Sequence, residues 1–353
     1  MTIVANSYAC VIGVDTHART HTLAVIEPTG AVLDIAKFDT ATPALARAIS
    51  WIAARTTDTH ATLVVIEGIG SYGAKFARAC TDAGYLVVEP LPTAPALRRT
   101  RGKSDPIDAE LIARSVLPAA TNRLRTPRDD QGERAAMRIL ITAREQLNTQ
   151  RTATINALTA LLRTTDLHVD ARRPLTRTTI ATIAAWRTRP DTIAITTART
   201  EARRLARTIR TADADLAANA QALTALVKSS PAAVLLNDTG IGAITAATIY
   251  TAWSHPGRLH SEAAFANLAG ACPLPASSGN ITRHRVNRGG DRRLNHALHT
   301  IALTRMRVDP TTQAYVQRRL ADNRTPREIR RCLKRYIARQ LHRELTAATL
   351  DRT

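Results

Sequence analysis

Aromatic side chains are scarce in this chain, since Phe, Trp and Tyr make up only 3% of its 353 residues. Stacking of bases on aromatic rings is therefore a minor contribution to any binding of nucleic acid. Cysteine is also rare, and the four cysteines form no Cys-x-x-Cys pair and no Cys/His cluster with zinc-ligand spacing. We expect them to be small, buried apolar residues in a reducing cytoplasm.

Long apolar runs are missing as well. No stretch of about 18 apolar residues occurs, and residues 1–10 lack the basic start and apolar core of a signal peptide. The sequence therefore predicts no association with a membrane. It indicates a cytoplasmic protein.

Acidic residues are few relative to basic ones, with 29 Asp and Glu against 49 Lys and Arg and a net charge of +20. Because neutralising phosphates releases condensed counterions, this charge favours a polyanionic partner over a merely soluble basic protein. The excess is largest in residues 281–343, which contain 17 basic and 4 acidic residues. Nucleic acid is the predicted partner.

The first 128 residues alternate strand patterns with helix patterns. Apolar, β-branched runs typical of buried strands occupy residues 8–15, 21–27, 31–38, 62–67 and 85–89. Helical patterns occupy residues 43–54, 74–83, 93–100 and 105–116. The order βββαβαβα gives an antiparallel meander extended by parallel crossovers. This order predicts an α/β fold of the ribonuclease H-like type.

Residues 129–230 carry no strand signals. Apolar residues such as Leu205 and Ile209 recur every three or four positions, which predicts two long helices around a linker containing Pro174 and Pro190. The pattern fits the helices of an ordinary bundle and a projecting coiled-coil hairpin equally well. The rest of the chain is predicted to be a mainly α-helical domain. The predicted domains are residues 1–128, 129–230 and 231–353.

Four acids stand where a sheet and a helix begin or end. Asp15 closes the first predicted strand and Glu67 the fourth, so both are expected at one edge of the sheet, where ligands of α/β folds usually lie. Pro106 suits the first position of a helix and Asp105 its N-cap, which places Asp108 one turn further on. Residues three apart on a helix share a face, so these two acids point the same way.

Clustered carboxylates are tolerable mainly when cations neutralise them. Two Mg²⁺ ions about 4 Å apart would do so, and would also activate a nucleophile and stabilise the leaving oxygen of a phosphodiester. Mn²⁺ is the alternative ion. Taken alone, Asp105 and Asp108 are equally well explained as helix-start acids favoured by the helix dipole. Asp15 and Glu67 carry more weight, because an acid that closes an apolar strand has no packing role.

Three other residues near these acids compete for a role. His17 follows Asp15 closely and is either a contact to phosphate or metal or a structural histidine, the commoner case. Glu110 lies off the face of Asp108, and Glu89 ends the fifth predicted strand. Both glutamates are expected to be solvated or structural.

A serine in the C-terminal part is a candidate nucleophile. Ser278 lies in the segment P-L-P-A-S-S-G-N, where Gly279 permits close approach of the backbone to a phosphate. A serine hydroxyl is a weak nucleophile unless its proton is removed, and Ser-Ser-Gly is also a common surface turn. Arginines that can stabilise charge on a phosphate follow it, namely Arg283, Arg285, Arg288, Arg292 and Arg293.

Two further features are candidate contacts to nucleic acid. The Gly240-Ile241-Gly242 segment precedes a helix and is either a plain turn or part of a helix-hairpin-helix element, whose backbone N–H groups meet phosphate. The basic C-terminal helices are either solvated or bind a phosphate or A-form backbone. Their candidate contacts are Arg331, Lys334 and Arg335.

Six segments together resemble a known family. V-I-G-V-D-T-H at 11–17, V-V-I-E-G-I-G-S-Y-G at 64–73 and K-S-D-P-I-D-A-E-L-I-A-R at 103–114 resemble the DEDD transposases of the insertion-sequence-110 family. The second conserved domain of that family is similar to residues 239–246, 265–280 and 285–295.

This resemblance implies a RuvC-like N-terminal domain, a helical coiled-coil region and a C-terminal serine transposase domain. It assigns metal binding to Asp15, Glu67, Asp105 and Asp108, and the role of nucleophile to Ser278. It also implies an element-encoded noncoding guide RNA that pairs with donor and target DNA, and assembly as a dimer or tetramer. The expected function is that of an insertion-sequence transposase or recombinase that cuts and rejoins DNA.

Three alternatives stay open. A hydrolytic RuvC-like endonuclease or Holliday-junction resolvase would use the carboxylates with water alone. A small-molecule kinase of the actin-like fold also begins with a strand-borne acid, but the high basic charge disfavours it. A non-catalytic protein that binds nucleic acid would retain its binding without the acids.

Overall fold

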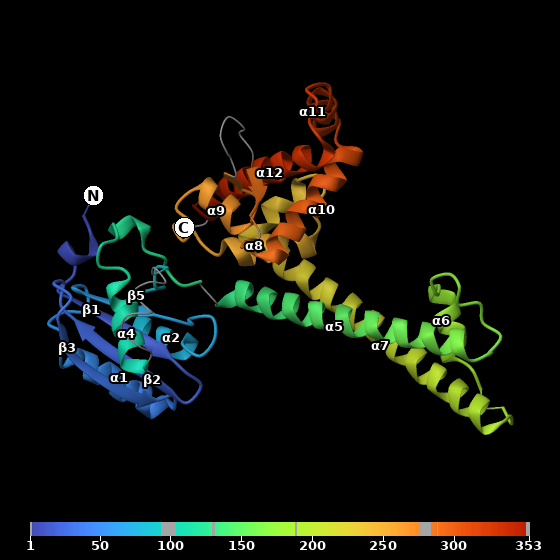
Figure 1. Ribbon diagram of the computed structural model, residues 1–353, viewed down its shortest axis with the longest axis horizontal. Coiled ribbons are helices and arrows are strands. Elements are labelled where there is room, and N and C mark those ends of the chain that lie inside the picture. The colour runs from blue at the N-terminus through green and yellow to red at the C-terminus, as the bar shows by residue number, and fades with distance from the viewer. Residues whose placement is uncertain are drawn as a thin grey trace. The chain divides into compact units, whose positions relative to one another are not determined.

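A computed structural model describes residues 2–92, 104–128, 131–187, 189–275, 284–287 and 289–350. The chain divides into two compact units (Figure 1). The first comprises Met1–Asp129 with His255–Ser261, and the second comprises Asp130–Ser254 with Glu262–Thr353. The predicted boundaries at residues 128 and 230 stay a prediction.

A mixed five-stranded sheet forms the centre of the first unit. Its strands are β1 (Cys10–Thr16), β2 (Thr20–Ile26), β3 (Val32–Asp39), β4 (Thr62–Ile66) and β5 (Leu86–Val88). Their spatial order is β3-β2-β1-β4-β5. The pairs β1–β2 and β2–β3 are antiparallel, whereas β1–β4 and β4–β5 are parallel. This is an α/β fold of the ribonuclease H-like type, in the predicted order of strands and helices. The helix predicted at residues 93–100 lies outside the described residues.

Helices cover both faces of the sheet. Helices α1 (Thr42–Ala53) and α2 (Ala74–Asp82) pack apolar residues on one face, against the side chains of Ile12 and Val14. Helix α4 (Asp105–Arg114) packs on the other face, against Val11. Successive residues of a strand alternate between faces, which explains why β1 and β4 are buried throughout and carry continuous apolar runs.

The absence of a side chain at Gly13 lets α4 approach the sheet closely. A Cβ at Gly13 would lie 2.0 Å from the carbonyl oxygen of Ala109 and 2.6 Å from the backbone nitrogen of Ala113. Val11, Gly13 and Asp15 share one face of β1 because side chains alternate along a strand. The close contact at Gly13 therefore brings the start of α4 to the same face as Asp15.

Two long helices begin the second unit, and they lie side by side in Figure 1. They are α5 (Gly132–Thr164) and α7 (Ile193–Ser229). The linker between them was predicted to be irregular, but it contains a further helix, α6 (Arg177–Ala184). Ile180 and Ile183 of α6 are buried with apolar residues of α5 and α7. Tertiary packing therefore stabilises a helix that is too short to be stable by itself.

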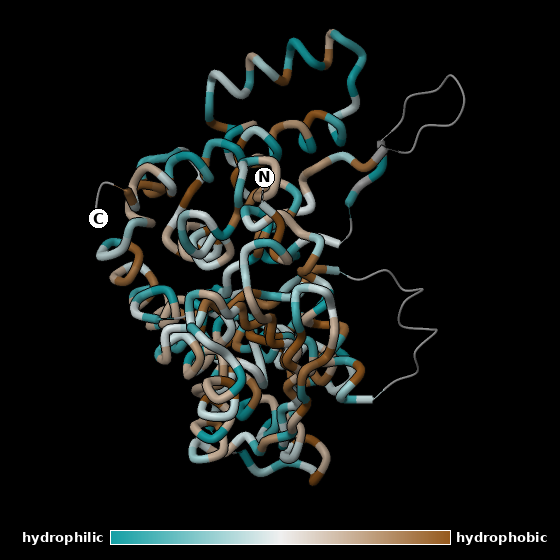
Figure 2. Tube along the Cα trace, turned by 90° about the vertical axis from the view of Figure 1, so that its left-hand side faces the viewer, coloured by the Kyte–Doolittle hydropathy of each residue, from teal (hydrophilic) through white to brown (hydrophobic). Residues whose placement is uncertain are grey.

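The remainder of the second unit is mainly helical. A 3₁₀ turn at Pro231–Asn237 leads into α8 (Ala243–Trp253), and a small hairpin pairs β6 (Pro273–Pro275) with β7 (His284–Val286). The other helices are α9 (Glu262–Leu268), α10 (Arg292–Val308), α11 (Pro310–Ala321) and α12 (Pro326–Leu350). Hydrophilic and hydrophobic residues alternate along most helices in Figure 2, as expected of helices with one buried face.

Candidate active site

Asp15 is a buried carboxylate on the central strand of the sheet. It lies near the end of β1, where it pairs with Thr22 of β2, and the residue is only 7% exposed. The Nε2 atom of His17 lies 3.1 Å from its Oδ2 atom. An acid this well buried is unusual unless a cation or a donor neutralises it.

The acids of α4 lie one position further into the helix than predicted. Asp105 was expected to be the N-cap, but the backbone of Ser104 is extended and the N–H of Asp108 bonds to the Ser104 carbonyl oxygen at 2.9 Å. Ser104 is therefore the N-cap and Asp105 the first helical residue. The helix also ends at Arg114 instead of residue 116. Because Asp105 does not cap the helix, its carboxylate is available to other groups.

Glu67 directly follows β4, and its backbone N–H bonds to the carbonyl oxygen of Val14 at 3.1 Å. This bond continues the pairing between β4 and β1, so it brings the backbone of Glu67 next to the residue that precedes Asp15. Glu67 and Asp108 line the same depression of about 200 Å³. Among the described residues, however, the ligand atoms that lie within 4.8 Å of one another belong to Asp15, His17 and Asp105, and Glu67 and Asp108 lie outside that group.

The other three acids act electrostatically on Asp15. Burial raises the pKa of Asp15, and the charges of Asp108, Asp105 and Glu67 raise it further, whereas His17 lowers it. Protonation of Asp15 or a bound cation would relieve this cost. The buried Asp15 therefore lies within electrostatic reach of each of the other three predicted carboxylates.

His17 joins this group, although a structural role was the commoner expectation for it. Ligand atoms of Asp15, His17 and Asp105 all lie within 4.8 Å of one another. Carboxylate oxygens suit Mg²⁺ and Mn²⁺, and an imidazole nitrogen is a common ligand of transition metals. The donor set therefore fits a divalent cation. The spacing D-x-H after a buried strand was the sequence signal for this residue.

Lys37 was missed by the sequence analysis. Its Nζ atom lies 2.8 Å from Oδ2 of Asp105, and this contact is the leading cause that lowers the pKa of the Asp105 carboxyl. Asp15 pairs with Thr22 of β2, which in turn pairs with Lys37 of β3. Paired residues of neighbouring strands share a face, so the lysine lies on the α4 side. Only the strand register, which the sequence does not specify, reveals this row.

Glu89 and Glu110 have structural partners. Arg258 approaches Glu89 at 3.2 Å, and the exposed fractions of the two side chains are only 10% and 29%. Glu110 accepts a 2.7 Å hydrogen bond from Arg114 one turn along α4. Both glutamates thus pair with arginines of the first unit.

The predicted C-terminal contacts fall into two groups. Ser278, Arg283 and Arg288 lie outside the described residues. Four others line one cavity of about 580 Å³, namely Arg285 on β7 with Arg331, Lys334 and Arg335 on α12. Arg292, at the start of α10, lines an adjoining cavity of about 480 Å³.

Two family models match the chain. Residues 12–166 match the DEDD model described as transposase, and residues 232–317 match the model described as transposase IS116/IS110/IS902 family. The chain belongs to the IS110 family of transposases. A transposase acts on DNA, which provides the polyanionic partner expected from the net charge. A search of curated proteins finds no match.

The first match includes all four carboxylates of this IS110-family transposase, and the second includes Ser278. Helix α12 lies beyond both matches. Within the described part of the transposase, no helix has the length and apolar character needed to cross a membrane.

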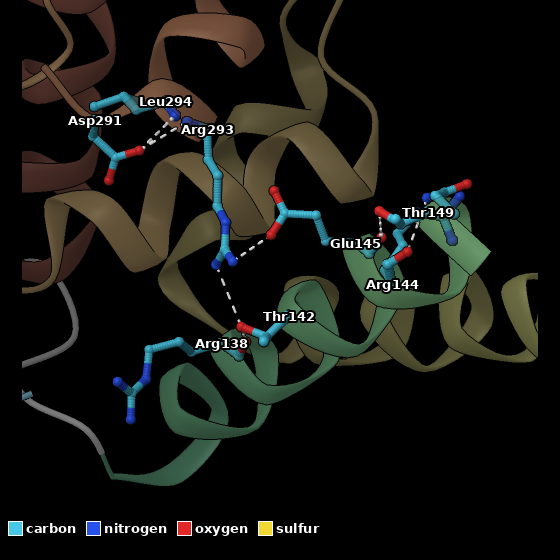
Figure 3. Close-up of polar contacts among 9 residues, drawn as sticks. Arg138, Thr142, Arg144, Glu145, Thr149, Asp291, Arg293 and Leu294 are labelled. Atoms are coloured by element: carbon cyan, nitrogen blue, oxygen red, sulfur yellow. Dashed lines mark hydrogen bonds and ion pairs between the residues drawn. The ribbon is translucent and has the colours of Figure 1, made fainter. Parts of the chain in front are cut away.

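Arg293 of the transposase has protein partners, although it was predicted to contact nucleic acid. Figure 3 shows its guanidinium reaching from α10 to α5, where it forms an ion pair with Glu145 and donates to Oγ1 of Thr142 at 3.3 Å. Asp291 caps α10 by accepting the backbone N–H groups of Arg293 and Leu294. Arg293 thus fixes the start of α10 against α5.

The Gly240-Ile241-Gly242 segment of the transposase forms a turn before α8, an arrangement common to both alternatives considered for it, the plain turn and the helix-hairpin-helix element. Gly240 has a φ of +86°, and a Cβ there would lie 3.2 Å from Cβ of Thr304 on α10. Gly242 is the N-cap, and a Cβ there would have no heavy atom within 4 Å. Gly240 therefore serves packing and turn geometry, whereas Gly242 leaves the start of α8 open.

Proposed function

We propose that this transposase cuts and rejoins DNA phosphodiesters at a divalent-metal site formed by Asp15, Glu67, Asp105 and Asp108. The observation that carries the proposal is the grouping of ligand atoms of the buried Asp15 with those of His17 and Asp105, with Asp108 and Glu67 near enough for their charges to raise the pKa of Asp15. No packing requirement explains such a group, and a divalent cation would offset the mutual repulsion. Mg²⁺ is the proposed ion and Mn²⁺ the substitute.

The chain's own residues divide the work at this site. The carboxylates, with His17, would hold the metal, which when bound supplies Lewis-acid stabilisation of charge on the phosphate. The ammonium of Lys37, already 2.8 Å from Asp105, adds a positive charge beside the site. The short approach of α4 at Gly13 holds the helix-borne acids against the strand-borne ones. Such rigid placement is what phosphoryl transfer requires of a protein.

The proposed nucleophile is Ser278. It lies in the segment that matches the C-terminal family model, in an S-S-G sequence followed by arginines. Attack of its hydroxyl oxygen on phosphorus would form a serine–DNA phosphodiester and release one DNA hydroxyl, while the serine proton passes to a base. The number of phosphodiester bonds is conserved, so the released hydroxyl can attack in turn and rejoin the strand.

The resemblance to the family supports four further parts of the proposal. The first unit would be a RuvC-like domain, and α5 with α7 would form a coiled coil. An element-encoded noncoding RNA would pair with donor and target DNA. The protein would act as a homo-oligomer, a dimer or a tetramer, on DNA.

Adduct formation tests the proposal directly. Labelled nicked or junction DNA is incubated with the protein and Mg²⁺, and the products are separated on a denaturing gel. We expect a protein–DNA adduct with the wild type and none with Asp15→Asn or Ser278→Ala. Strand cutting without an adduct, and full activity of Ser278→Ala, would exclude the serine mechanism.

A hydrolytic RuvC-like nuclease is the second candidate. One observation favours it. The four acids, His17 and Lys37 all belong to one compact unit, and position 278 is not part of that unit. The same gel separates the two functions, because a hydrolase releases free DNA ends from the wild type and from Ser278→Ala alike.

A further inference from the structure

A second basic feature lies far along the chain from the acids, in the C-terminal part of the second unit. The cavity of about 580 Å³ is bordered by β6, β7, α10, α11 and α12. Five cationic side chains of its wall are Arg285, Arg324, Arg331, Lys334 and Arg335. So many positive charges around one hollow repel each other and favour an anionic occupant.

The acid among the described residues of this wall, Glu328, offsets only part of the positive charge. Glu328 accepts the backbone N–H and the hydroxyl of Thr325, both at 2.9 Å, and these bonds are the main cause that lowers its pKa. It thus forms a capping box at the start of α12. The charges of Arg324 and Arg331 also contribute to lowering the pKa of Glu328. Another arginine of the wall, Arg319, forms an ion pair with Asp322 at 2.9 Å. Within the described residues, no ion pair involves Arg331, Lys334 or Arg335.

Lys334 stands at the centre of this basic region. It lines the cavity of about 580 Å³ and also the adjoining one of about 480 Å³, so it belongs to the wall that the two share. Arg292, His296 and His299 border the second cavity. The two cavities therefore present cationic side chains on either side of one lysine.

The Lys334 side chain is fixed in place. Its Nζ atom donates to Oδ1 of Asn295 at 2.6 Å, and Nδ2 of Asn295 donates to the carbonyl oxygen of Ala269 at 2.6 Å. Burial lowers the pKa of the half-buried ammonium from its ordinary value, so the charge is incompletely hydrated. One neutral acceptor leaves two of its three N–H donors for a ligand.

We infer that these two cavities form a binding cleft for the phosphodiester backbone of a nucleic acid, with Lys334 as its central phosphate anchor and Asn295 as the residue that positions it. A row of phosphates matches a cleft that is cationic along its length, whereas a single small anion would occupy one cavity. Aromatic residues do not line either cavity among the described residues, so bases would not be held by stacking.

This inference rests on the proposed function, because it takes the protein to act on nucleic acid. The inference goes beyond the proposed function by assigning a binding role to α12, which lies outside both family matches. Arg331, Lys334 and Arg335 were all predicted as contacts from charge alone. Lys334 and Asn295 are set apart by geometry, since they belong to both cavities.

Equilibrium binding of full-length protein tests the inference. Fluorescently labelled duplex DNA and a labelled RNA hairpin, both of arbitrary sequence, are titrated in EDTA at several salt concentrations. We expect Lys334→Gln to weaken binding roughly tenfold in at least one of the two arms. The slope of log K against log salt should fall by about one in that arm, because one phosphate contact is lost. The affected arm identifies DNA or RNA as the source of the phosphates.

The matched control is Lys228→Gln, which removes an exposed lysine at the end of α7 in the same unit. Lys334→Arg keeps the charge and should retain most of the affinity. Equal binding by Lys334→Gln and Lys228→Gln in both arms would overturn the inference. If Lys334→Gln melts at a lower temperature than the wild type, the exposed Arg335→Gln replaces it in the same comparison.

Binding in EDTA does not depend on strand cutting. A failed adduct assay would therefore leave this inference standing, and unchanged binding by the cleft variants would leave the metal site standing.

Discussion

At the scale of single residues, the acid site contains two groups besides the four carboxylates. His17 contributes a nitrogen close to Asp15 and Asp105, and Lys37 contributes an ammonium that contacts Asp105. If the site binds the proposed metal, the two should affect its affinity in opposite directions, since His17 would be a ligand and Lys37 a competing cation. Metal affinity, measured apart from catalysis, distinguishes them.

We expect His17→Ala to weaken Mn²⁺ binding by about tenfold or more, as loss of a ligand or of a group that orients a ligand does. Isothermal titration with Mn²⁺ measures the change, and His60→Ala, at an exposed position of the same unit, is the control. Equal affinities for the two variants would show that His17 does not contact the ion.

Lys37→Met should strengthen Mn²⁺ binding several-fold, because the ammonium no longer competes for Asp105. Strand cutting by the same variant should nevertheless fall if the lysine also stabilises the reacting phosphate. Lys75→Met removes an exposed lysine of α2 and serves as the control. Weaker Mn²⁺ binding by Lys37→Met would contradict the competition.

At the scale of elements, polar groups fix how α5 and α7 align. Asn219 of α7 is only 8% exposed, and its side chain donates to the carbonyl oxygen of Leu140 at 2.9 Å. Arg144 of α5 donates back to the carbonyl oxygen of Leu216 at 3.0 Å. Apolar seams tolerate sliding by a turn, whereas these bonds hold in one register only.

Asn219→Ala should therefore lower the free energy of unfolding by about 0.5–1.5 kcal/mol, because it removes the hydrogen bond by which the buried Asn219 side chain links the two helices. Urea unfolding followed by circular dichroism measures this. Asn148→Ala on the exposed side of α5 should change the stability by less than about 0.5 kcal/mol. Equal losses for the two variants would mean that the buried bond contributes nothing.

The N-cap of α11 gives a pH-dependent prediction. Asp309 accepts the hydroxyl and the backbone N–H of Thr312, and these bonds lower the pKa of its carboxyl. Its contribution to stability is thus present above the pKa of the unfolded chain, near 4, and is lost as the pH falls through the lower folded value.

Asp309→Ala should cost about 1 kcal/mol at neutral pH, the usual value of a cap. The difference from the wild type should shrink below about pH 4, where the carboxyl becomes protonated. Thermal melts of both proteins across this range give the comparison, and a difference independent of pH would rule out the ionised cap.

The sequence predicted the long strands and helices better than the helix ends, the linker and the strand register. The strands that carry Asp15 and Glu67 were predicted because continuous apolar runs mark buried strands. Helix α6 was missed, since a short helix between prolines depends on packing that its own sequence does not report. The N-cap of α4 was placed one residue late, because Ser104 and Asp105 are both good caps. Lys37 was missed because strand register is set in three dimensions.

At the scale of the whole molecule, the net charge of +20 governs how the protein meets DNA. We expect affinity for duplex DNA to fall by about 10³-fold or more between roughly 50 and 200 mM salt, as for proteins that make several phosphate contacts. Fluorescence anisotropy across this range measures the slope. An affinity insensitive to salt would show that phosphate contacts are not the main source of binding.

Gly13 shows how closely the catalytic proposal depends on the core. The hydrogen atom in place of a side chain sets the spacing between β1 and α4, and with it the distance between strand-borne and helix-borne acids. A single methyl group at this position would push α4 away from β1. The affinity of the proposed site for a metal ion would then fall, although every proposed ligand was still present. The geometry of the site thus depends on a hydrogen atom that is not itself a ligand.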